Sequence, residues 1–143
     1  MTKEPAAPVF LVVVLRAFGV LDLCALGAVF LPLRWMAAAH AWLGLGPMPE
    51  GPLVGYLARS ASALYALHGA AVFFISFDVR RYWRLITFLA AVALLHGAIM
   101  LGIDLAERMP MWWTSVEGLG FAATGAVVLI AQAVAARDGS GRG

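Results

Sequence analysis

Residues 84–103 have the sequence RLITFLAAVALLHGAIMLGI, a long apolar run that contains one ionisable residue, His96, after the opening Arg84. About 20 mostly apolar residues are what an α-helix needs to cross the hydrocarbon core of a bilayer. Lipid offers no hydrogen-bond partner to a backbone group, so such a segment is stable only as a helix and an open sheet is excluded. This stretch therefore predicts a membrane-spanning helix.

Three further segments share this character: residues 9–33, 57–77 and 117–136. The composition agrees, since 63% of the 143 residues are hydrophobic, 13% are charged and the mean hydropathy is +0.90. Soluble domains are roughly 45–50% apolar, and a small one could not bury so many apolar side chains. We predict an all-α polytopic membrane protein, an antiparallel four-helix transmembrane bundle.

The breaks between these spans define one transmembrane domain over residues 9–136. A short segment, residues 1–8, precedes it, and a flexible tail, residues 137–143, follows it. The Gly- and Pro-rich residues 44–52 cannot continue a helix. Residues 34–42, just before them, form a short amphipathic stretch that we expect to lie along the membrane interface.

The positively charged residues predict the orientation, because Lys and Arg are enriched in cytoplasmic connections. Lys3, Arg80, Arg81, Arg84, Arg137 and Arg142 fall on the side of both termini, and Arg34, Arg59 and Arg108 fall on the other. We predict a bacterial inner-membrane protein with both termini in the cytoplasm. The net charge of +2 is small and scattered, which excludes the basic footprint of a nucleic-acid-binding protein.

Polar side chains in or near the spans are the candidate functional residues. Asp, Lys or Arg at the centre of a spanning helix costs about 2.5 to 3.5 kcal/mol on insertion scales, so such groups usually face the bundle and pair. The candidate buried polar cluster comprises Asp22, Arg59, Tyr65, His68, His96, Asp104 and Glu117.

Three of these residues fall near one depth: Asp22 and His68 near the middle of their spans, and His96 slightly outward. Two histidines on neighbouring helices can ligate a haem iron axially. Alternatively, each histidine can hydrogen-bond across the bundle, as polar residues in membrane helices commonly do. Depth does not say which residues face one another. Both histidines lie in the same tetrapeptide, Leu-His-Gly-Ala, at 67–70 and 95–98, an echo too short to establish duplication.

Arg59, Asp104 and Glu117 fall at the outward ends of their helices. One cation can offset two acids that would otherwise repel each other. The trio is consistent with a shallow polar pocket or with an ion-pair clasp that fixes the register of the helices, and the clasp is the simpler interpretation.

Catalytic and metal-binding motifs are absent: there is no Cys/His zinc spacing, HExxH, GxSxG, P-loop or GxGxxG. The leading hypothesis is a non-enzymatic accessory or structural subunit, in a larger membrane complex or a homo-oligomer. One alternative is a haem- or quinone-associated redox protein that uses His68 and His96. Another is a bundle that handles a small molecule or protons through a polar pocket at its outer end.

Loose motifs spread from residue 9 to residue 136 also resemble the small bacterial DoxX-like membrane proteins. They are the early arginine in Leu15–Gly19, the pair Tyr65 and Gly69, the turn Asp78–Arg81 and the helix entry Pro110–Gly118. Some members of that wider group are associated with quinone-linked oxidoreductases. The resemblance therefore implies a four-helix subunit at the membrane end of electron transfer, without assigning any residue to a cofactor.

Overall fold

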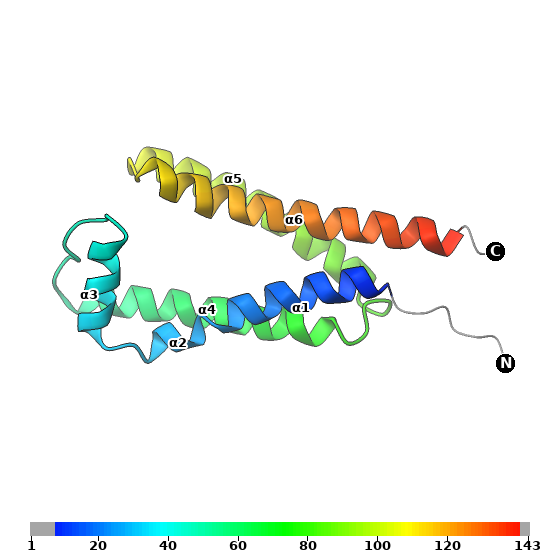
Figure 1. Ribbon diagram of the computed structural model, residues 1–143, viewed down its shortest axis with the longest axis horizontal. Coiled ribbons are helices and arrows are strands. Elements are labelled where there is room, and N and C mark those ends of the chain that lie inside the picture. Colours follow the sequence, from blue (N-terminus) through cyan, green and yellow to red (C-terminus); the bar gives the residue numbers. More distant parts are fainter. Residues whose placement is uncertain (1–7, 141–143) are drawn as a thin grey trace. The chain divides into compact units, whose positions relative to one another are not determined.

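The structure, a computed structural model, describes residues 8–140, with side chains as far as Arg137. Over this range the chain forms helices joined by turns and loops, with no strand (Figure 1). The helices are α1 (Val9–Leu23), α2 (Leu26–Val29), α3 (Leu33–Trp42), α4 (Pro52–Ile75), α5 (Trp83–Ala106) and α6 (Met111–Ser140). The all-α prediction is confirmed.

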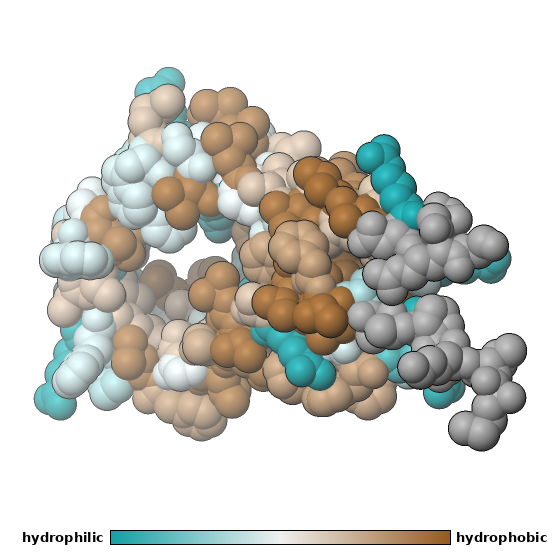
Figure 2. All heavy atoms as spheres, turned by 45° about the vertical axis from the view of Figure 1, so that its right-hand side comes forward, coloured by the Kyte–Doolittle hydropathy of each residue, from teal (hydrophilic) through white to brown (hydrophobic). Residues whose placement is uncertain are grey.

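Four segments among the described residues are long and apolar enough to cross a membrane: Val9–Val29, Pro52–Ile75, Trp83–Ala106 and Met111–Arg137. Large apolar side chains are exposed along all four, and much of the face in Figure 2 is apolar. Exposure of so much apolar surface to water is unfavourable, whereas lipid tails solvate it. The chain is a multi-pass helical membrane protein whose spans contact the bilayer.

The described structure divides into two compact units, and the single transmembrane domain stays a prediction. The α4 unit comprises residues 17–74, and the α5–α6 unit comprises the described residues up to Arg16 together with those from Ile75 onward. Helix α1 therefore contributes its first half to one unit and its second half to the other. Each unit is described by itself below.

The first span is not the unbroken helix that was expected over residues 9–33. After Leu23 the backbone tightens, with Ala25 N donating to Asp22 O at 3.0 Å and Gly27 N donating to Cys24 O at 3.1 Å. These bonds span three residues, as in a 3₁₀-helix, instead of four. Helix α2 then ends at Val29, shortly before Pro32, whose ring nitrogen has no hydrogen to donate.

The second and fourth spans begin earlier than expected. Helix α4 starts at Pro52, because proline suits the first position of a helix, where its missing N–H is not needed. Helix α6 starts at Met111, and the Pro110 carbonyl accepts from the backbone N–H groups of Trp113 and Thr114. Trp112 and Trp113, which precede the span expected over residues 117–136, thus lie in the first turn of α6, and the connection from α5 is residues 107–110.

The chain ends also differ from expectation. Helix α6 continues to Ser140, so residues 137–140, expected to be part of a flexible tail, are helical. Residues 1–7 and 141–143, which include Lys3 and Arg142 of the orientation argument, lie outside the described residues.

Candidate functional site

Two glycines bring α1 and α4 into backbone contact within the α4 unit. A Cβ placed on Gly69 would lie 2.6 Å from the carbonyl oxygen of Gly19 and 2.6 Å from the nitrogen of Leu23. A Cβ on Gly19 would lie 2.9 Å from the nitrogen of Phe73 and 3.0 Å from the oxygen of Gly69. Since real Cβ contacts below 3.0 Å are essentially absent, this crossing requires glycine at position 69 and leaves almost no room at position 19.

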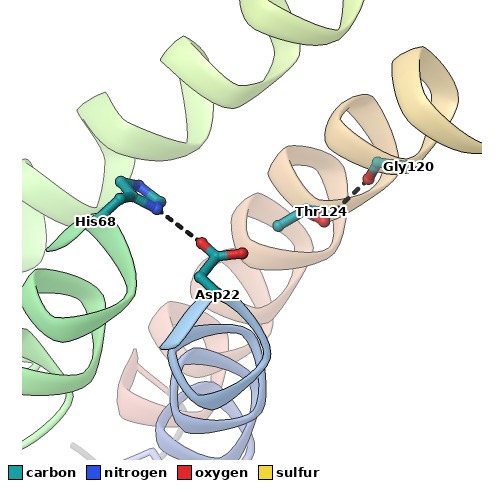
Figure 3. A network of polar contacts seen from close by, with 4 residues as sticks. All are labelled: Asp22, His68, Gly120 and Thr124. Carbon is teal, nitrogen blue, oxygen red and sulfur yellow. Dashed lines mark hydrogen bonds and ion pairs between the residues drawn. The ribbon is translucent and has the colours of Figure 1, made fainter. Parts of the chain in front are cut away.

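The α1–α4 crossing aligns two of the predicted polar residues. His68 immediately precedes Gly69, and Asp22 follows Gly19 by three residues. Across the crossing, His68 Nδ1 lies 2.8 Å from Asp22 Oδ2 (Figure 3). The His68 side chain is 52% exposed and that of Asp22 is 25% exposed. Of the three residues predicted at one depth, these two face each other.

This pairing determines what His68 can do chemically. When Nδ1 donates to the carboxylate, the ring is held in one orientation, just as a hydrogen-bonded carboxylate orients a histidine that binds a metal. Nε2 then remains to accept a proton or to bind a further group. In an apolar span the two side chains also serve as each other's polar partner, which lowers the cost of holding either in the bilayer.

The α5–α6 unit contains a crossing built in the same way. A Cβ on Gly97 would lie 2.6 Å from Gly118 O and 2.7 Å from Ala122 N, and His96 immediately precedes Gly97. Here the residue three positions after Gly118 is Phe121. Its ring centroid lies 4.4 Å from that of His96, edge to face. Nε2 of His96 is buried without a hydrogen-bond partner among the described residues.

The histidines proposed as a haem pair therefore have different surroundings and belong to different units. His68 is hydrogen-bonded to a carboxylate, and His96 is packed on an aromatic ring. The haem and quinone alternatives stay predictions.

Arg59 hydrogen-bonds to the backbone at the end of the first span, within the α4 unit. Its Nε donates to Val29 O and its Nη2 donates to Leu31 O, both at 3.1 Å. These carbonyls lie where α2 ends ahead of Pro32, so no following helical turn satisfies them. Gly55 leaves room for the guanidinium, because a Cβ there would lie 3.3 Å from Arg59 Nη1.

The two acids predicted beside Arg59 belong to the α5–α6 unit. Glu117 accepts a hydrogen bond from the indole Nε1 of Trp113, one turn earlier on α6. Asp104, in the last turn of α5, is 2% exposed, and its Oδ2 has no hydrogen-bond partner among the described residues. The outer cluster of Arg59 with the two acids stays a prediction.

Tyr65, the remaining candidate, lies half buried on α4, three residues before His68. Residues three apart share one face of a helix. Tyr65 therefore belongs to the same side of α4 as the Asp22–His68 pair.

The cluster predicted from sequence omitted a polar clasp in the α5–α6 unit. Gln132 is buried, its Nε2 donates to Trp83 O at 3.0 Å, and its Oε1 accepts from Thr87 Oγ1 at 3.1 Å. A glutamine within a span must find partners, which is the signal that could have revealed it. Arg16 also has polar and aromatic partners in this unit. Its Nε donates to Ser76 Oγ at 3.4 Å, and its guanidinium carbon lies 5.2 Å from the centroid of the Phe77 ring.

Comparison with known proteins yields no relative: no family model, curated protein or solved structure matches the chain. The DoxX-like resemblance therefore stays a prediction.

Proposed function

We propose that this chain is a non-enzymatic accessory subunit of a membrane assembly, which contacts its neighbours through the face of the α4 unit that carries Asp22 and His68. The supporting observation is the partial exposure of this hydrogen-bonded pair in the middle of two spans. The neighbour is another subunit or a second copy of the chain.

His68 needs a polar partner on its exposed side. About half of its side chain is open in this chain, although it sits at the depth of the hydrocarbon core. Lipid tails cannot hydrogen-bond to an imidazole nitrogen, and membrane proteins turn such groups toward protein or water-filled space. A neighbouring helix that offers a polar group to Nε2 meets this requirement.

The proposed setting follows from the charge distribution. The assembly lies in a bacterial inner membrane, with both termini of the chain in the cytoplasm. The described arginines of the turn between α4 and α5, Arg80 and Arg81, are exposed, as is Arg84 at the start of α5, which fits a cytoplasmic connection.

Native mass spectrometry of the protein extracted in lipid nanodiscs tests the proposal. We expect species heavier than the 15.2 kDa chain, either multiples of that mass or complexes with a second protein. Recovery of the single chain alone, at the expression level of the native gene, would contradict a subunit role.

A matched pair of variants tests the face itself. Replacing Asp22 and His68 together by leucine removes both polar groups and is expected to reduce the assembled fraction. The control is Leu67→Ala, which alters an exposed apolar residue about 100° away around α4 and should leave the assembly intact. If both variants assemble like the native protein, the pair is not at the contact.

A second candidate function is proton handling, favoured by the bond between His68 Nδ1 and Asp22. A histidine oriented by a carboxylate can load and release a proton at its other nitrogen. Proteoliposomes that contain a pH-sensitive dye test this candidate under an imposed potential. We expect a proton flux that His68→Gln abolishes; a flux equal to that of empty liposomes would eliminate the candidate.

A further inference from the structure

Helix α3 lies within the α4 unit but is barely supported by it. None of its ten residues is buried. Isolated helices of this length are marginal in water, so α3 needs a surface to pack on. That surface is only partly provided by the chain itself.

The two long edges of α3 differ in character. Met36, Ala37 and His40 are half buried, and His40 Nδ1 donates to Gly46 O at 2.9 Å across the following turn. The opposite edge consists of Trp35, Ala38, Ala39 and Trp42, and we call it the tryptophan edge. Trp35 is 59% and Trp42 is 85% exposed. Their seven-residue spacing places them within about 20° of each other around the helix.

The direction of α3 also separates it from the spans. Figure 1 shows α3 lying across the end of α4 instead of alongside it. Helix α3 connects the end of the first span to the start of the second, so both of its ends lie at one boundary of the membrane. A helix crosswise to a spanning helix at that boundary runs along the membrane surface.

We infer that the tryptophan edge of α3 inserts into the headgroup region of the bilayer and anchors the α4 unit at that depth. Tryptophan is enriched at this level because its ring is apolar and its indole N–H requires a polar partner. Arg34, exposed beside Trp35, carries a charge complementary to lipid phosphate. The occupant is therefore lipid, continuous with the lipid that surrounds the flanking spans. This inference does not depend on the proposed subunit role.

Spin labelling tests the inference with closely matched sites. Cys24→Ala removes the single cysteine of the chain. In that background Ala38→Cys and Ala39→Cys place a nitroxide on the tryptophan edge, and Ala37→Cys places one on the half-buried edge. The labelled proteins are reconstituted in vesicles of phosphatidylethanolamine and phosphatidylglycerol, and collisions with oxygen and with a water-soluble nickel chelate are measured.

The expected result is frequent oxygen collisions at positions 38 and 39, with a depth at the level of the headgroups, and low collision rates with both reagents at position 37. High nickel accessibility at 38 and 39 would place the edge in water. Low accessibility there to both reagents would show that protein covers it. Either result would overturn the inference.

Discussion

The crossing of α1 with α4 and the crossing of α5 with α6 are built on the same backbone arrangement but carry different chemistry. In each, a glycine approaches the carbonyl oxygen of the opposing glycine and the amide nitrogen four residues further on. In each, the residue before one glycine meets the residue three positions after the other. That residue pair is His68 with Asp22 in one crossing and His96 with Phe121 in the other.

This difference shows that glycine sets how closely the helices approach, while the neighbouring positions determine whether the contact is polar. One crossing holds a hydrogen-bonded pair of ionisable groups. The other holds an edge-to-face aromatic contact and obtains its polar contact elsewhere, from Gln132 with Thr87. The repeated tetrapeptide Leu-His-Gly-Ala thus places a histidine beside each crossing without giving the two histidines one role.

Adding a methyl group at each crossing tests whether glycine sets the approach of the helices, and it has the largest expected effect on stability. Gly69→Ala and Gly97→Ala each force a Cβ against opposing backbone. We expect each to lower the free energy of unfolding by about 2 kcal/mol, as strain exceeds the gain in helix propensity. Steric trapping in bicelles measures it.

The controls for this prediction are Gly102→Ala and Gly120→Ala, where nothing lies within 4 Å of an added Cβ. These changes should be neutral or stabilising by up to about 1 kcal/mol. If Gly102→Ala and Gly120→Ala lowered the free energy of unfolding as much as Gly69→Ala and Gly97→Ala, the helices would not touch at positions 69 and 97.

Transplanting the polar pair tests whether the two crossings have equivalent geometry. Phe121→Asp puts a carboxylate opposite His96, as Asp22 is opposite His68. We expect the substitution to be destabilising, but by about 1.5 kcal/mol less with His96 present than in a His96→Leu background, because the imidazole facing position 121 can partner the acid. A double-mutant cycle on unfolding free energies gives this coupling, and a value of zero would refute the equivalence of the two crossings.

The native pair can be measured in the same way. A cycle of Asp22→Ala and His68→Ala should give a coupling of about 0.6 kcal/mol, typical of hydrogen bonds between membrane helices. The partial exposure of His68 argues against a larger value. No measurable coupling would mean that the hydrogen bond contributes nothing to the stability of the α4 unit.

The smallest expected effect concerns the clasp of the α5–α6 unit. Gln132→Leu removes the bond that Nε2 donates to the Trp83 carbonyl and the bond that Oε1 accepts from Thr87. The single hydroxyl hydrogen of Thr87 can then be donated to the Trp83 carbonyl, 3.1 Å away. We expect a loss of a few tenths of a kcal/mol, measured by the same trapping method. Thr87→Val is the companion variant. If Gln132→Leu lowered the free energy of unfolding more than Gly97→Ala, the polar clasp would contribute more to stability than the glycine crossing, the reverse of what we expect.

The sequence predicted the fold class and the approximate location of every span, because each long apolar run needs lipid and lipid permits only helices there. It predicted the helix ends less well. The second and fourth spans were expected to begin at residues 57 and 117, whereas α4 begins at Pro52 and α6 begins at Met111, just after Pro110. The tightened turn after Leu23 has no signature in hydropathy, since its residues are as apolar as those of a regular helix.

For the candidate site, residue type was accessible from sequence, since an ionisable residue in an apolar run is conspicuous. The sequence alone was enough to identify a multi-pass helical membrane protein, and it predicted that Asp22, His68 and His96 lie near one depth. Only the tertiary structure decided that Asp22 meets His68 while His96 meets Phe121. The physical reason is that helix rotation depends on the glycine contacts between helices, which hydropathy along a single chain does not record.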